Sequence, residues 1–151
     1  MNNFQRVGSI SNAHAGRDFE EIAKAVLERK GIRTRYDVVA PVGIGHRKKP
    51  HKFDLGSDDP KVLVECKSHT WTSGDNMPSA KVKNWSEAMY YFHAAPAEYR
   101  KIFFIQKSMK RSSGESLGTY YLRTHFHFVP PDVEFWEFDI DTQTLELLDH
   151  Q

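Results

Sequence analysis

The chain has 151 residues with a formal net charge of +1, and 39% of its residues are hydrophobic and 27% charged. This composition excludes a disordered chain, and the length suits a single domain, which we expect to span residues 1–151. One cysteine cannot form an intrachain disulfide, and no apolar run approaches the ~20 residues that span a bilayer. We therefore expect a cytoplasmic protein without a membrane partner.

The first half of the chain begins with a helical pattern and continues with extended ones. Residues 16–30 carry apolar side chains at helical spacing, and Gly31 follows as a stop signal, so a helix is expected there. Hydrophobic and turn-forming residues then predict, in order, a strand over 32–40, a loop over 41–45, a short strand over 52–55 and a turn over 56–60.

The second half continues this alternation. Residues 62–68 start apolar and end charged, which suits a strand that begins in the core and opens into a cleft. Serine and glutamate at the two ends of 112–115 match a helix capping box. The remaining expected elements are a helix over 79–93, a central strand over 102–105, a helix over 113–124, and strand structure over 133–148 with a turn near 141–144.

An acid two residues before a lysine occurs in three places: Glu28-Arg29-Lys30, Asp59-Pro60-Lys61 and Glu65-Cys66-Lys67. The first lies on a predicted helix, where residues two apart point in different directions. The second lies in a predicted turn, where proline interrupts a strand. Only Glu65 and Lys67 lie on a predicted strand, whose period of two projects both side chains to one face.

A second carboxylate is expected from the preceding strand. If residues 56–61 form the turn, the two strands are antiparallel and Asp54 comes near Glu65. Two converging carboxylates repel each other unless a cation neutralises them, and Mg²⁺ prefers oxygen ligands of this kind. Such a cation could polarise a phosphodiester and activate water, while Lys67 orients that water or stabilises the transition-state charge.

The first predicted helix carries two adjacent acids. Glu20 shares a helical face with Ala23 and Leu27 and so borders the buried stripe, whereas Glu21 groups with charged residues on the solvated side. We therefore select Glu20 as the acid that the helix contributes to a site.

The order of helix, three strands, helix and strand, together with Asp54 and the Glu65-x-Lys67 motif, resembles the αβββαβ core of the PD-(D/E)XK nuclease superfamily over roughly residues 16–106. The resemblance implies an α/β, restriction-endonuclease-like fold with a mixed central sheet flanked by helices, followed by a C-terminal helix and strands. Phe53 rather than proline precedes Asp54. The one literal Pro-Asp pair, at 131–132, follows the Glu-x-Lys strand, and we treat it as loop.

The same resemblance implies a function and its site residues. It implies a Mg²⁺-dependent DNA endonuclease, restriction-type, in which Mn²⁺ can substitute and double-strand cleavage requires a homodimer or a larger assembly. Asp54 and Glu65 would be metal ligands, joined by the backbone carbonyl of Cys66, with Lys67 as the catalytic lysine and Glu20 as the first-helix acid. The Cys66 side chain should face the core and is not expected to act as a nucleophile.

A net charge of +1 requires that the cations for DNA phosphates be clustered locally. Residues 46–52 hold four cations and two histidines immediately before Asp54, and two further lysines open the predicted helix after the Glu-x-Lys strand. Strand alternation continues the face of Glu65 and Lys67 to His69. The expected DNA-binding residues are Arg47, Lys48, Lys49, Lys52, His69, Lys81 and Lys83.

Two other interpretations stay open at this point. One is a resolvase-like or repair nuclease of the same superfamily. The other is a non-catalytic nucleic-acid-binding or protein-binding domain with this fold, in which the acids serve only as salt-bridge partners. The eight histidines do not favour zinc, because no ligand pair has standard zinc-site spacing.

Overall fold

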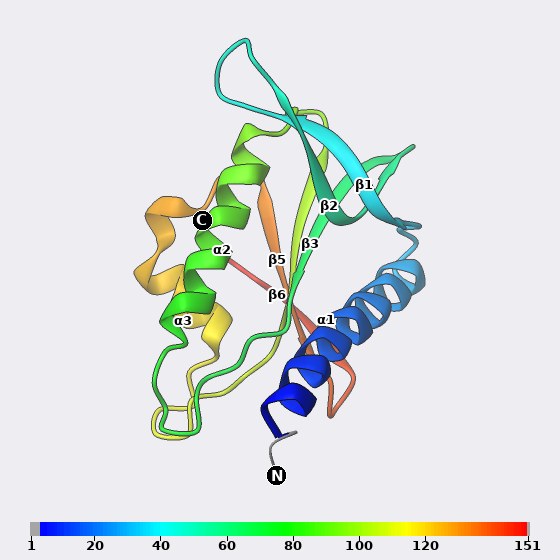
Figure 1. The fold of residues 1–151 in the computed structure, drawn as a ribbon. Coiled ribbons are helices and arrows are strands. Elements are labelled where there is room, and N and C mark those ends of the chain that lie inside the picture. Colours follow the sequence, from blue (N-terminus) through cyan, green and yellow to red (C-terminus); the bar gives the residue numbers. More distant parts are fainter. Residues whose placement is uncertain (1–3, 151) are drawn as a thin grey trace.

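A six-stranded sheet with strand order β1-β2-β3-β4-β5-β6 runs through the computed structural model, which describes residues 4–150, and their side chains from residue 16 onward (Figure 1). The elements are α1 (Phe4–Arg29), β1 (Arg35–Val42), β2 (Lys49–Asp58), β3 (Lys61–Lys67), α2 (Ser79–Ala94), β4 (Arg100–Gln106), α3 (Leu117–Thr124), a 3-10 turn (Phe126–Phe128), β5 (Val133–Asp139) and β6 (Thr144–Leu148). The predicted α/β class is confirmed.

The sheet is mixed, as expected. β1, β2 and β3 form an antiparallel meander, β4 and β5 run parallel to β3, and β6 returns antiparallel to β5. Parallel neighbours need a crossover connection, and α2 supplies it between β3 and β4. From α1 to β4 the chain therefore runs helix, three strands, helix, strand, in the order that the sequence predicts.

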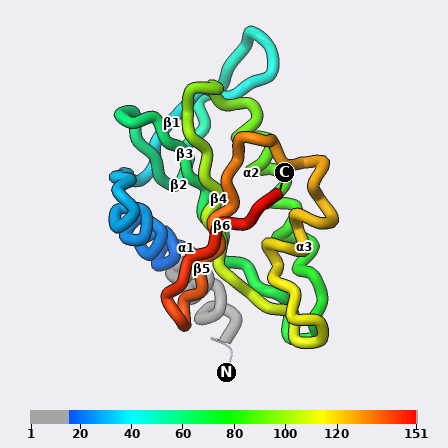
Figure 2. Tube along the Cα trace, turned by 180° about the vertical axis from the view of Figure 1, so that it is seen from behind, coloured from blue at the N-terminus to red at the C-terminus, as the bar shows by residue number. Residues whose placement is uncertain are grey.

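Both faces of the sheet are covered. The two views agree that α1 lies on one face and that α2 and α3 lie on the other (Figures 1 and 2). Adjacent residues of the central strands alternate between the two cores: Leu63 and Phe103 pack on the side of α2, whereas Val64 and Ile102 pack on the side of α1. Two-sided burial explains why β4 reads as a continuous apolar run.

The first helix is longer than its predicted 16–30 span. α1 has 26 residues and continues through Gly16 without interruption. No helix formed by residues 4–150 combines the length and the apolar character that a membrane crossing would need.

The predicted capping box over 112–115 is wrong, and α3 begins at Leu117. Ser116 caps this helix instead, because its Oγ accepts the backbone N–H of Thr119 at 3.1 Å. Glu115 does not reach back to the cap, since its carboxylate is paired with Arg123 at 2.8 Å. The start of the predicted capping box is held by Asp75, which is distant in sequence. Its carboxylate accepts the backbone N–H groups of Arg111 and Ser112.

Strand β2 is also longer than the predicted 52–55. It extends from Lys49 to Asp58, so that only Asp59 and Pro60 remain in the turn before β3. β1 lies later than the predicted 32–40 and includes Pro41, which faces Pro50 of β2. Proline is tolerated there because β1 is an edge strand of the sheet.

Gly56 marks the closest approach of the first three strands. A Cβ atom at this position would lie 2.6 Å from the Val62 carbonyl oxygen and 3.0 Å from Val38 Cβ. We predict that Gly56→Ala lowers the free energy of unfolding by about 1–3 kcal/mol, because backbone on one side and a packed valine on the other must shift. Urea unfolding measures this change. Gly45→Ala is the control, since its Cβ would meet nothing within 4 Å; equal losses in both variants would contradict the prediction.

Candidate functional site

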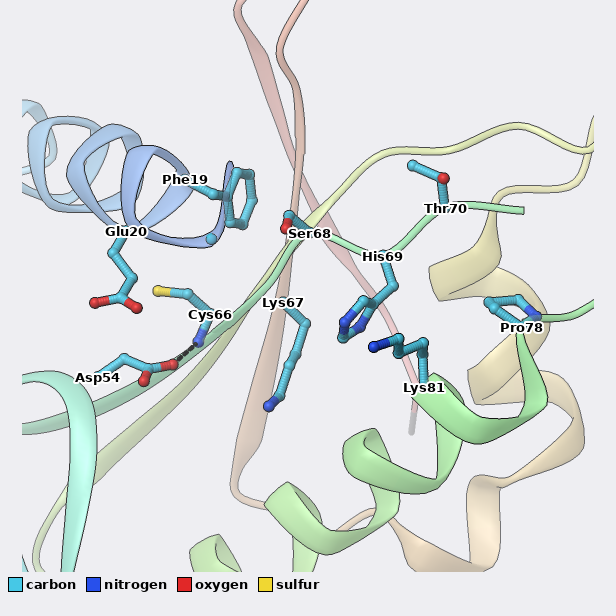
Figure 3. A pocket seen from close by; sticks show the side chains of 11 residues that line it. Phe19, Glu20, Asp54, Cys66, Lys67, Ser68, His69, Thr70, Pro78 and Lys81 are labelled. Carbon is cyan, nitrogen blue, oxygen red and sulfur yellow. Dashed lines mark hydrogen bonds between the residues drawn. The ribbon is translucent and has the colours of Figure 1, made fainter. Parts of the chain in front are cut away.

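Strands β2 and β3 separate where the predicted acids lie. Their ladder pairs Asp58 with Lys61 and ends at Leu55 and Val64, so that the next opposed positions would be Asp54 and Glu65. Beyond this point the strands are linked through a side chain: the Asp54 Oδ2 accepts the backbone N–H of Cys66 at 2.8 Å (Figure 3). A carboxylate thus replaces the main-chain acceptor that a continued strand would have provided.

The separation coincides with a change of face in β2. Phe53 packs in the core on the side of α2, whereas Leu55 packs in the core on the side of α1, although residues two apart in a regular strand share a face. β1 changes face at the same level, around Asp37, whose φ of 57° is left-handed. Asp54 therefore lies at the level where both strands of the β1–β2 hairpin change the face of the sheet on which their side chains pack.

A cavity of about 500 Å³ opens at the end of β3. It lies between α1, Asp54 in the middle of β2, the end of β3 and the start of α2, and Figure 3 shows acids on one side of it and cations on the other. The lining residues are Gly16, Phe19, Glu20, Asp54, Cys66, Lys67, Ser68, His69, Thr70, Pro78 and Lys81.

Glu20 and Asp54 form the acidic side. In Figure 3 the Glu20 carboxylate hangs from α1 on the same side of the cavity as Asp54 of β2, whose own carboxylate points toward the Cys66 backbone. Burial raises the pKa of Glu20 and the negative charge of Asp54 adds to the rise, while Arg17, 3.4 Å from the Glu20 carboxylate, opposes it. The helix acid selected from the sequence therefore does lie beside Asp54.

Glu65 lies next to the cavity but does not line it. The residue is 6% exposed, and its Oε1 is 3.3 Å from His51 Nε2. Burial raises the pKa of Glu65 to about 7; the hydrogen bond from His51 opposes this rise, and the charge of Asp54 adds to it. The structure therefore brings Asp54 and Glu65 close enough to interact electrostatically, with different protein partners for each.

The cationic side is formed by Lys67, His69 and Lys81. His69 Nδ1 accepts the indole N–H of Trp85 at 3.3 Å, so the proton of the neutral imidazole is on Nε2. Burial, followed by the charges of the two lysines, lowers the pKa of His69 to about 4. Near neutral pH this histidine is an uncharged hydrogen-bond donor between two ammonium groups.

Cys66 presents different groups to different neighbours. Its side chain packs against the core on the side of α1 and lines the cavity. Burial raises the pKa of the thiol well above its ordinary value, and the charge of Asp54 adds to this, so a thiolate nucleophile is disfavoured. Because the N–H and C=O of a residue in a strand point toward the same neighbour, the Cys66 carbonyl faces the gap beside Asp54.

Only part of the predicted basic run, residues 46–52, lies near the cavity: His51 contacts Glu65, whereas the tip of the hairpin is remote. The tip of the β1–β2 hairpin packs on the end of α2, where the N–H of Gly43 donates to the Ala94 carbonyl at 3.1 Å. The cavity lies at the start of that helix, near Lys81, and 16 residues make α2 about 24 Å long. Arg47 and Lys48 are thus remote from the site. Of the other expected DNA-binding lysines, Lys81 lines the cavity, whereas three are exposed and outside the lining: Lys49, Lys52 and Lys83.

Two residues that touch the site were missed from the sequence. His51 contacts Glu65, and Trp85 orients His69. His51 shares a strand face with Phe53, so the correct length of β2 would have placed it toward the core. Trp85 belongs to the apolar stripe of α2, and periodicity alone gives no sign of its hydrogen bond.

The donors around Asp54 suit a hard divalent cation. No three His, Cys, Asp or Glu side chains of the described residues are grouped closely enough to hold a metal by themselves. Mg²⁺ does not require such a group, since it commonly binds one or two carboxylates and keeps water and substrate phosphates as further ligands. The carboxylates of Asp54 and Glu65, together with the Cys66 carbonyl that faces the gap beside Asp54, are compatible with that mode.

No protein-family model matches the chain, and neither a curated protein nor a solved structure is significantly similar to it. The class of protein is therefore defined by the fold and the site alone. It is an α/β protein whose mixed sheet opens at one strand end into a cavity with an acidic and a cationic side.

The buried state of Glu65 has a consequence for stability. Its pKa is about 7 in the folded chain against 4.5 as its ordinary value, so the folded state holds the proton more tightly. The carboxyl therefore destabilises the metal-free protein progressively as the pH rises from about 4.5 through 7, by roughly 3 kcal/mol in total. Glu65→Gln removes this effect.

We predict that the stability of Glu65→Gln relative to wild type increases by roughly 3 kcal/mol between pH 4 and pH 8, because glutamine does not ionise. Urea unfolding in EDTA across this range measures the difference. Glu21→Gln, on the exposed side of α1, is the control and should change stability by less than about 0.5 kcal/mol. A pH-independent difference for Glu65→Gln would contradict the prediction.

Proposed function

We propose that this protein is a Mg²⁺-dependent endonuclease that hydrolyses DNA phosphodiester bonds and has the restriction-endonuclease-like core of the PD-(D/E)XK superfamily. One observation carries the proposal. Asp54 bonds to the backbone of the Glu65-Cys66-Lys67 motif at the point where β2 and β3 separate, beside a cavity that has an acidic and a cationic side. Neither a lone acid-x-lysine triplet nor a solvated strand face has that arrangement.

The acids have distinct roles under this proposal. Asp54 and Glu65 would hold the cation, with the Cys66 carbonyl as the main-chain ligand. When bound, Mg²⁺ would supply Lewis-acid polarisation of the phosphate and lower the pKa of a water molecule. Glu20, electrostatically coupled to Asp54, adds negative charge on the side of α1 and so favours the cation.

The side chains on the cationic side would contact the phosphate groups of the substrate. Lys67 places an ammonium in the cavity, where it can stabilise the charge that develops on the phosphate or orient the attacking water. Lys81 and the Nε2–H of His69 provide further donors for phosphate oxygens, in a sequence-independent manner. A DNA strand would thus be oriented with a phosphate between the acids and these donors.

Restriction-type cleavage is the preferred role, with a resolvase-like or repair nuclease as the alternative. A protomer that carries one active site would cut one strand at a time, so double-strand cleavage requires a homodimer or a larger assembly with two sites.

We predict that wild-type protein cleaves supercoiled plasmid in Mg²⁺ or Mn²⁺ but not in EDTA, and that Lys67→Ala lowers the rate about 10²–10³-fold by removing a donor to the transition state. Gel electrophoresis over time measures the loss of supercoiled DNA. Lys61→Ala is the matched control, because Lys61 belongs to a second acid-x-lysine triplet, begins the same strand and is exposed, 4.8 Å above the Tyr99 ring.

Cleavage that persists in EDTA, or that Lys67→Ala leaves unchanged, contradicts the mechanism. DNA binding without cleavage in either metal supports the non-catalytic binding domain instead. Equal losses in Lys61→Ala and Lys67→Ala would show that the effect is a general loss of positive charge and not one of the site.

A further inference from the structure

His51 is fixed beside Glu65 by residues from three elements. Its Nε2 is 3.3 Å from the Glu65 Oε1 on β3. Its ring stacks on Tyr91 of α2, with centroids 3.7 Å apart and planes 11° from parallel. Its ring also makes a T-shaped contact with Phe53, with centroids 4.7 Å apart. Two aromatic neighbours therefore hold the imidazole where it meets the carboxylate.

This pair is well shielded from solvent. The side chains of His51 and Glu65 are 23% and 8% exposed. A buried carboxylate without a hydrogen-bond donor is costly, so a donor in a fixed position decides where the carboxylate rests. A carboxylate that ligates a metal is ionised and only accepts hydrogen bonds, so in that state Nε2 is the donor. The contact uses Oε1 alone.

We propose that His51 is a positioning residue that holds the Glu65 carboxylate in the orientation required for binding the divalent cation. The inference rests on the proposed function, because it concerns the same metal site. Carboxylate ligands are typically oriented by hydrogen bonds from neighbouring groups, and loss of such a partner weakens metal binding or activity about 10- to 100-fold. Tyr91 contacts His51 through its ring face, and its hydroxyl interacts with Glu87, so removal of the hydroxyl should leave the stacking intact.

The geometry sets this histidine apart from two others, one in the cavity and one in the hairpin. His69 lines the cavity and bonds to Trp85, away from the acids. His46 lies in the hairpin between β1 and β2, where it is exposed. His51 alone among these three contacts one of the two predicted metal ligands.

The test measures Mn²⁺ affinity without DNA, by electron paramagnetic resonance of free Mn²⁺, alongside plasmid cleavage. We expect His51→Leu to weaken Mn²⁺ binding about 10- to 100-fold and to slow cleavage, because leucine fills space but donates no hydrogen bond. His51→Gln should restore most of the affinity through its amide N–H. His46→Leu is the matched control and should behave as wild type, while Asp54→Asn should abolish binding at this site.

Tyr91 variants keep the proposal testable if His51→Leu does not fold, which circular dichroism detects. Tyr91→Phe retains the stacked ring and should match wild type, whereas Tyr91→Leu removes it and should weaken Mn²⁺ binding. The inference is overturned if His51→Leu binds Mn²⁺ as wild type does, if His51→Gln is as weak as His51→Leu, or if the folded Tyr91→Leu variant keeps full affinity.

The outcome for the wild type separates the two proposals. A wild type that neither binds Mn²⁺ nor cleaves DNA overturns the proposed function and, with it, the role of His51. A wild type that binds and cleaves, together with an unaffected His51→Leu, overturns only the role of His51.

Discussion

The hydrogen bond from the Cys66 backbone to the Asp54 carboxylate is the interaction on which the architecture of the site depends. Where two strands separate, backbone N–H groups lose their acceptors on the neighbouring strand. A buried donor without an acceptor is costly in free energy. Asp54 supplies that acceptor, and hydrogen bonds to charged groups contribute about 1.5–3 kcal/mol. β2 can therefore switch faces at this point: Phe53 packs in the core on the side of α2 and Leu55 in the core on the side of α1. The cavity forms where β2 and β3 separate.

The two covered faces of the sheet divide the charges of this cavity. α1 contributes Glu20 from one face, whereas the start of α2 contributes Lys81 from the other. Cys66 and Lys67 are adjacent on β3 and point to opposite faces of the sheet, so the end of this strand contributes one side chain to each side of the cavity (Figure 3). A net charge of +1 is thus compatible with a locally cationic surface, because the acids and the cations that line the cavity occupy different sides of it.

Local periodicity was sufficient to predict the order of elements through β4 and the side of α1 on which Glu20 lies, since both depend on residues a few positions apart. It failed where tertiary contacts decide. The serine and glutamate of 112–115 match a capping box, yet that segment is held by Asp75 and the helix starts later, at Leu117. The position of Arg47 depends on how the hairpin packs against α2, which no spacing in the sequence encodes. His51 was missed because β2 was predicted too short.

Each acid of the site has its own protein partner: Asp54 has the Cys66 backbone, Glu20 has Arg17, and Glu65 has His51. Their mutual repulsion is thereby relieved one carboxylate at a time, which explains why the side chains do not converge into a compact three-ligand group. Under the proposed function, a cation must compete with these partners, so its affinity in the absence of DNA is expected to be modest. Phosphate oxygens of a bound strand would supply the missing ligands, and cation binding would then be coupled to substrate binding at the same site.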